Sequence, residues 1–193
     1  MKARWIGSGI VVGLLLLSAA CGGGSYDEGA TSGESTPAET AETVMVARAS
    51  LESKSGSDVN GSATFSAAAG RVQLEVHVNN LPEGVHAAHI HAVGDCNSDD
   101  GKSAGGHWNP GEMDHGEWAM PPHHLGDLGN LEPDANGHAT MTMETELWTI
   151  GTGADNDVVG KAIIIHAGAD DFTSQPTGNA GGRIACGVIE GEM

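Results

Sequence analysis

The chain has 193 residues, of which 8 are basic and 26 acidic, and its formal net charge is −18. If residues 1–20 are removed by processing, six cations face the same 26 acids, and the net charge becomes −20. So few scattered cations cannot form the basic patch of a nucleic-acid-binding protein, which excludes nucleic acid as a partner.

Residues 1–20 have the layout of an export signal. Two cations precede the apolar run Ile10–Leu17, which is too short to span a membrane as a stable helix, and small residues follow. The stretch "LSAAC" resembles the lipobox of bacterial lipoproteins, although Ser18 stands where leucine is usual. We therefore predict lipidation of Cys21 and attachment to a bacterial membrane in the cell envelope or periplasm. Ordinary signal cleavage and secretion is the alternative.

Residues 21–43 are predicted to form a flexible tether. They consist mainly of Gly, Ser, Thr, Ala, Pro and Glu with one aromatic side chain, so they cannot bury enough apolar surface to offset the entropy lost on ordering. The folded domain is therefore expected to span residues 44–193, a length that is sufficient for one sizeable core.

The domain has the pattern of an all-β protein. Short stretches rich in β-branched residues, several of them alternating with period two, are separated by turn sequences, and no stretch has clear helical periodicity. This favours an antiparallel sandwich or barrel. The predicted strands are Thr43–Leu51, Val59–Ser66, Arg71–Val78, His138–Thr145 and Lys161–Ala167.

Two glycine-rich segments, roughly Gly94–Leu131 and Gly168–Gly182, are too long for simple connections. Loops of this length in a compact domain are usually functional. The first contains Cys96, which pairs with Cys186 if Cys21 carries lipid and the compartment is oxidising. The alternative is two unrelated buried thiols, but a Gly/Asp-rich loop suits an apolar thiol poorly.

Histidines predict a metal site. The "HIH" stretch places His89 and His91 on the same face of a strand. Three histidines with one carboxylate suit zinc, and four imidazoles suit copper. Two four-coordinate sites need eight ligands, so seven candidates suffice if His107, which lies between the two groups in sequence, bridges both metals. The candidates are His89, His91, His107, His115, His124, Asp127 and His166.

The order of the motifs resembles that of the copper,zinc superoxide dismutases. The stretches "HIH", "AGGHWNP", "HHLGDLGN", "IIIHAGADD" and "TGNAGGRIACGVI" extend over nearly all of residues 44–193. The resemblance implies an eight-stranded Greek-key β-barrel with two long metal-site loops, and dismutation of superoxide to dioxygen and hydrogen peroxide. It implies that copper is bound by His89, His91, His107 and His166, and zinc by His107, His115, His124 and Asp127.

The resemblance also implies roles for residues around the metals. Asp170 would hydrogen-bond one ligand of each metal, and Arg183 would be the guanidinium beside the copper. His107 would take a proton when copper is reduced. Cys96 and Cys186 match the family disulfide. The segment after His166 lacks the lysines of eukaryotic members, so we do not expect lysine steering from that loop.

Two functions of another class are the alternatives to a superoxide-removing enzyme. A noncatalytic copper/zinc-binding or metal-delivery module on the same fold commonly loses a copper ligand or the arginine, whereas this chain keeps all seven ligand positions and Arg183. A structural or adhesive sandwich with incidental histidines would bind no metal. The sequence leaves homodimer formation open.

Overall fold

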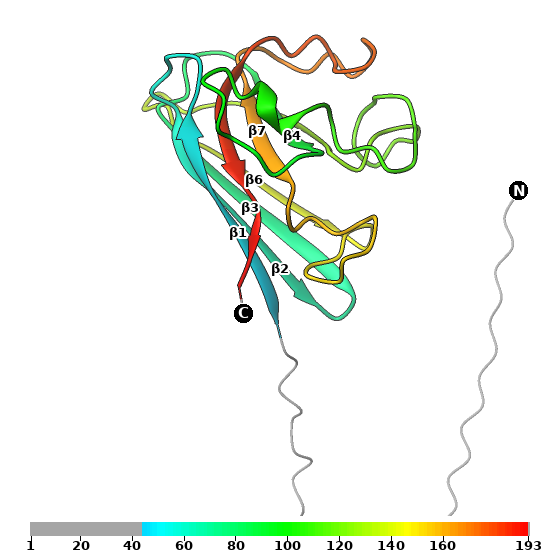
Figure 1. The fold of residues 1–193 in the computed structure, drawn as a ribbon. Coiled ribbons are helices and arrows are strands. Elements are labelled where there is room, and N and C mark those ends of the chain that lie inside the picture. Colours follow the sequence, from blue (N-terminus) through cyan, green and yellow to red (C-terminus); the bar gives the residue numbers. More distant parts are fainter. Residues whose placement is uncertain (1–43, 193) are drawn as a thin grey trace, which may run out of the picture. The chain divides into compact units, whose positions relative to one another are not determined.

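The computed structural model describes residues 44–192, which form an all-β fold with one short 3₁₀ turn and no α-helix (Figure 1). The predicted signal, tether and lipidation site lie outside the described residues. Within them, no helix is long and apolar enough to cross a membrane. The elements are β1 Met45–Ser53, β2 Asn60–Ala68, β3 Arg71–Asn79, β4 His86–His91, η1 Lys102–Ala104, β5 Asp127–Leu131, β6 Ala139–Thr145, β7 Ala162–His166, β8 Arg183–Val188 and β9 Glu190–Gly191.

Eight antiparallel strands form a nearly closed barrel in the order β5-β4-β7-β8-β1-β2-β3-β6. The strands at the two ends of this order, β5 and β6, also contact each other. Non-consecutive neighbours such as β3–β6 and β4–β7 are the crossovers expected of a Greek key. The predicted eight-stranded Greek-key barrel is therefore confirmed, with the two-residue β9 paired to β1 as an addition.

The five strands predicted from periodicity correspond to β1, β2, β3, β6 and β7, with ends shifted by a few residues. The prediction was wrong at the end of the first long loop, where Asp127–Leu131 forms β5. This strand has five residues, includes Gly129 at φ 112°, and pairs with β4 through an irregular register. Such a segment shows no alternation in sequence because its pairing partner, not its own composition, makes it a strand.

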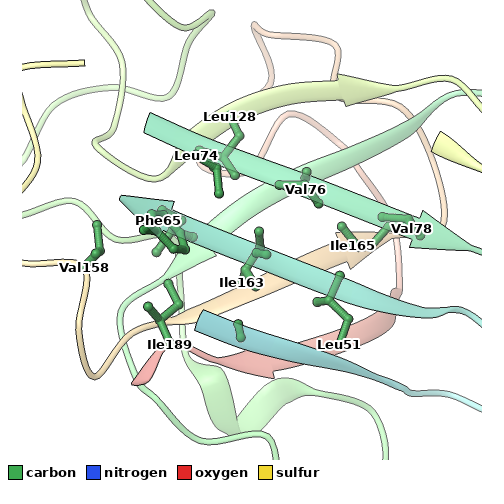
Figure 2. Close-up of a cluster of buried hydrophobic side chains, with 14 of the residues drawn as sticks. Leu51, Phe65, Leu74, Val76, Val78, Leu128, Val158, Ile163, Ile165 and Ile189 are labelled. Atoms are coloured by element: carbon green, nitrogen blue, oxygen red, sulfur yellow. The ribbon is translucent and has the colours of Figure 1, made fainter. Parts of the chain in front are cut away.

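The barrel interior is filled by the inward-facing side chains of the strands (Figure 2). Along β3, Val72, Leu74, Val76 and Val78 are buried while the residues between them are exposed, as the alternation predicts. Phe65 packs edge-to-face against Trp148, with the ring centroids 5.9 Å apart. This apolar interior makes the barrel a fixed frame for the loops.

Strands β4 and β7 are buried on both faces. Ala88, Ile90, Ile163 and Ile165 belong to the barrel core. The opposite face of this part of the sheet lies under the long loops, where a second, smaller apolar cluster forms. It consists of Ala104, Ala162, Ile164 and Cys186, with Cys96 packed against it. The histidines that alternate with the core residues of β4 therefore lie beneath loops instead of in solvent.

Candidate metal centre

The seven candidate ligands come from four segments that meet on the outer face of the barrel. β4 carries His89 and His91, β7 ends in His166, β5 begins with Asp127, and the loop before β5 carries the other three histidines. The loop is held to β4 next to His107, where the Trp108 N–H donates to Ile90 C=O at 2.8 Å. Trp108 is itself buried in the barrel core. This pairing places His107 beside the histidines of β4.

The first cluster consists of four buried imidazoles. One nitrogen from each lies within 4.8 Å of the others, and the residues are His89, His91, His107 and His166. The Nε2 atoms of His91 and His166 are 3.4 Å apart. His89 Nδ1 and His107 Nε2 are buried without a hydrogen-bond partner in the described structure. Buried polar atoms are normally paired, so these two nitrogens indicate a missing positive partner such as a metal ion.

The second cluster is centred on one carboxylate oxygen. Asp127 Oδ1 lies 2.9 Å from His107 Nδ1, 3.0 Å from His115 Nδ1 and 3.2 Å from His124 Nδ1. The Nδ1 atoms of His107 and His124 are 3.4 Å apart. In a tetrahedral zinc site with bonds of about 2.0–2.1 Å, neighbouring ligand atoms are about 3.3–3.4 Å apart. The four atoms therefore fit such a site with only small adjustments.

His107 belongs to both clusters. Its Nδ1 faces Asp127, whereas its Nε2 is the unpartnered nitrogen of the first cluster. Burial lowers the pKa of His107 to about 4, although the Asp127 carboxylate opposes this shift. Burial also lowers the pKa of His91 to about 2 and that of His166 to about 3. These imidazoles are therefore neutral at physiological pH, which is the form that binds metal ions.

Asp170 contacts one histidine of each cluster. Its Oδ2 is 2.7 Å from His89 Nε2, and its Oδ1 is 2.8 Å from His115 Nε2. Both contacts are fully buried. Burial alone would raise the pKa of Asp170, but hydrogen bonds from His89, Phe172 N–H and His115 hold it below its ordinary value. A buried carboxylate in this position fixes which nitrogen of each imidazole faces a metal.

Two side-chain amides hold the backbone of this region, and sequence analysis missed both. Asn130 accepts from Asp170 N–H at 2.8 Å and donates to Asp170 C=O at 3.0 Å. Gln175 pairs in the same way with His115. Neither amide has a sequence signal, because each partner lies at least 40 residues away along the chain.

Arg183 lies next to the first cluster, at the start of β8 and opposite His166 in the sheet. Its guanidinium donates to Gly101 C=O at 2.8 Å and to Gly105 C=O at 2.6 Å. Gly105 C=O also accepts from His91 Nδ1 at 2.9 Å. Arg183 is partly buried, and burial lowers its pKa below the ordinary value of a guanidinium, an effect that Asp100 opposes. The same carbonyl thus orients the cation and one imidazole of the cluster.

A family model described as copper/zinc superoxide dismutase matches residues 59–189, which is more than half of the chain. The match includes all seven candidate ligands, Asp170, Arg183 and both cysteines of the folded domain.

The chain belongs to the copper/zinc superoxide dismutase family.

Curated relatives agree with this assignment. Superoxide dismutase [Cu-Zn] of Schizosaccharomyces pombe is 40% identical over 142 residues, covering 69% of this chain and 90% of that protein. Superoxide dismutase [Cu-Zn] 1 of Aquifex aeolicus is 39% identical over 123 residues, covering 62% and 73% of the respective chains. The extracellular superoxide dismutase [Cu-Zn] of Drosophila melanogaster is 39% identical over 139 residues, covering 68% and 75%.

Solved structures share the fold. A mutant of a SOD-like protein from Bacillus subtilis aligns with a TM-score of 0.65 and 35% identity, over 74% of this chain and 96% of the other. The clock protein EA4 aligns with a TM-score of 0.67 and 33% identity, over 75% and 93%.

Superoxide dismutase activity, with copper and zinc as cofactors, follows from the family and from the two clusters of metal-binding side chains. Superoxide is the substrate that fits this family. The disulfide and the extracellular relative both fit an exported protein.

The remaining histidines lie outside both clusters. His86 is buried and contacts the carbonyl oxygens of His166 and Pro82, as expected for a structural residue. His123 contacts the carbonyl of His124 instead of entering the second cluster. His77 and His138 occupy exposed positions, and so do Met113 and Met120.

The predicted disulfide joins Cys96 to Cys186, which are 90 positions apart in the sequence and whose Cα atoms are 5.7 Å apart. We predict that replacing both cysteines by serine lowers the free energy of unfolding by about 2–5 kcal/mol, because the unfolded chain gains the entropy of a long open loop. Denaturant unfolding of the metal-free domain measures this. Asn97→Ser, an exposed change in the same loop, is the control, and equal stability of both variants would contradict the prediction.

Proposed function

We propose that the first cluster binds copper and the second binds zinc, with His107 bridging the two ions. The observation that carries this proposal is the pair of unpartnered buried nitrogens, His89 Nδ1 and His107 Nε2, beside a second cluster whose spacing suits zinc. Four imidazoles suit copper, and three imidazoles with a carboxylate suit zinc. When bound, copper supplies the one-electron chemistry that oxidises one superoxide to dioxygen and reduces the next to hydrogen peroxide.

His107 is proposed to hold one of the two protons that reduction of superoxide to hydrogen peroxide consumes, and the second comes from solvent. Its Nε2 faces the first cluster and has no hydrogen-bond partner among the described residues, so this nitrogen would take a proton when copper is reduced and no longer occupies it. Its Nδ1 stays next to Asp127 Oδ1 at 2.9 Å, which keeps the ring in place while Nε2 gains and loses the proton. The proton is then held at a fixed position in the first cluster.

Arg183 is proposed to attract the substrate. Superoxide is an anion and the chain carries an excess of acids, so a local cation must offset the general repulsion. The two carbonyls of Gly101 and Gly105 fix the guanidinium but do not use all five of its N–H groups. The remaining donors can face a small anion beside the first cluster.

A noncatalytic metal-binding role is the second candidate. The name of one structural neighbour, the clock protein EA4, gives a role other than dismutation to a related chain. The full ligand set together with Arg183 favours the enzyme, because a binding module has no need for a cation held beside the copper cluster. Superoxide removal by the purified domain loaded with both metals distinguishes the two.

We predict that the reconstituted domain holds one copper and one zinc per chain. His166→Ala should mainly lose copper and His124→Ala mainly zinc, while His107→Ala should weaken both sites because this residue belongs to both clusters. Elemental analysis after dialysis measures this. His123→Ala, beside a zinc ligand in sequence, is the matched control and should keep both metals. Loss of the same metal in the His166 and His124 variants would reject the assignment.

We further predict that Arg183→Ala lowers the second-order rate of superoxide removal roughly tenfold or more, and that Arg183→Glu lowers it further by reversing the local field. Both variants should keep copper and zinc. The rate of Arg183→Ala should also depend less on ionic strength, because a screened attraction has been removed. Stopped-flow kinetics at several salt concentrations test this.

Arg48→Ala is the control for Arg183, since Arg48 pairs with Glu192 and is exposed. Its rate should stay close to that of the wild type. If both Arg183 variants are loaded with metal and as fast as the wild type, Arg183 has no part in substrate attraction.

We propose that lipid on Cys21 anchors the exported protein to a bacterial membrane in the periplasm. One acyl chain binds a membrane only marginally, so stable attachment requires more than one. We predict that the full-length protein fractionates with membranes and that Cys21→Ser releases it into the soluble fraction. Wild-type protein found soluble, with its mature N-terminus at Gly22 or later, would show simple secretion instead.

A further inference from the structure

Gln175, in the second long loop, holds both backbone polar groups of one residue in the first. Its Oε1 accepts from His115 N–H at 2.8 Å, and its Nε2 donates to His115 C=O at 2.9 Å. The two residues are 60 positions apart. The carboxamide therefore pairs with the N–H and C=O of one residue, as the backbone of a neighbouring strand does in a sheet.

The N–H and C=O groups of His115 make no other hydrogen bond among the described residues, although the next N–H, that of Gly116, donates to Asp127 Oδ2 at 3.1 Å. His115 lies in an irregular segment between η1 and β5, and it makes no backbone–backbone hydrogen bond in residues 44–192. Its imidazole is held at Nε2 by Asp170 Oδ1 at 2.8 Å, whereas its Nδ1 lies 3.0 Å from Asp127 Oδ1 and has no hydrogen-bond partner among the described residues. Gln175 thus holds the main chain of a residue whose ring is fixed at Nε2 and presents its free Nδ1 to the second cluster.

The turn that carries Gln175 also lies in close contact with the His115 ring. Gly178 N–H donates to Ser174 C=O at 2.7 Å, which closes the turn. A Cβ atom at Gly178 would overlap both Asp170 Oδ1 and His115 Nε2, so the glycine backbone lies directly on this pair. Because the turn is fixed at Gly178, Gln175 meets the backbone of His115 in a defined position.

We propose that Gln175 is a positioning residue for the second cluster, and that it sets how firmly the zinc is held. The inference rests on the proposed function, which assigns this cluster to zinc. Gln175 acts through His115: by fixing the backbone it holds Nδ1 in the cluster and Nε2 on Asp170. The order of the second loop is thereby linked to zinc retention, whereas no hydrogen bond joins Gln175 to a residue that belongs only to the copper cluster.

The test uses Gln175→Met, which keeps the length of the side chain and removes both hydrogen bonds. Gln175 is exposed, so the barrel core is unaffected. We expect zinc loss to a chelator to be roughly tenfold faster than in the wild type, the lower end of effects at residues around metal ligands. Copper loss from the same sample should be unchanged. Thr177→Ala, an exposed change in the same turn, is the matched control and should lose zinc at the wild-type rate.

Two further measurements distinguish a loss of His115 positioning from a general weakening of the fold. With cobalt(II) in place of zinc, the visible spectrum should change in Gln175→Met, while the copper signal in electron paramagnetic resonance should not. In the metal-free protein, hydrogen exchange at the His115 amide should be faster in Gln175→Met than in Thr177→Ala, because the amide has lost its acceptor.

The outcomes separate the two proposals. If the wild type takes up no zinc, or His124→Ala keeps its zinc, the proposed function fails. If the wild type binds zinc at this cluster but Gln175→Met matches it in zinc loss and in His115 exchange, only the role of Gln175 is overturned. Equal acceleration of copper and zinc loss in Gln175→Met would likewise overturn it, because that pattern reports a general weakening of the fold.

Discussion

Both groups of metal-binding side chains depend on a single imidazole ring, that of His107. The ring is rigid, so the positions of its two nitrogens tie the two groups together at a fixed separation. Every other ligand must be brought to one side of this ring or the other. The backbone pairing of Trp108 with Ile90 supplies the reference position, because it attaches the loop to β4 directly beside His107. The geometry of the whole centre therefore originates in a strand of the barrel.

The barrel and the loops contribute differently to this arrangement. Strands β4 and β7 supply His89, His91 and His166 from a packed sheet, whose positions are set by the apolar core. The ligands in the first long loop do not belong to a packed sheet, so polar contacts position them instead. Asp170 links His89 to His115. The side-chain amides of Asn130 and Gln175 bind the backbone of Asp170 and His115. The small apolar cluster around Cys186 and the disulfide then hold the first loop against the sheet.

Sequence alone predicted much of the fold, but unevenly. Alternation identified strands such as β3, because one of its faces is buried and the other exposed. It failed for β5, where Gly129 and the irregular pairing remove the pattern. The metal-site candidates could be found because histidine and aspartate are metal-binding residue types, and their spacing is visible in the sequence. The parts played by Asp170 and Arg183 came only from resemblance to a family. Gln175 could not be found at all, since its function depends on a contact 60 residues away and its residue type is common on surfaces.

One carbonyl oxygen, that of Gly105, accepts from both Arg183 and His91. The peptide is also confined, because Gly105 has φ 74° and a Cβ there would lie 3.2 Å from Val93 Cγ2. The proposed attraction of substrate by Arg183 and the orientation of His91 therefore cannot be changed independently of each other. A redesign that moves the cation to suit another anion would have to rebuild the acceptor that holds His91, and a redesign of His91 would shift the cation.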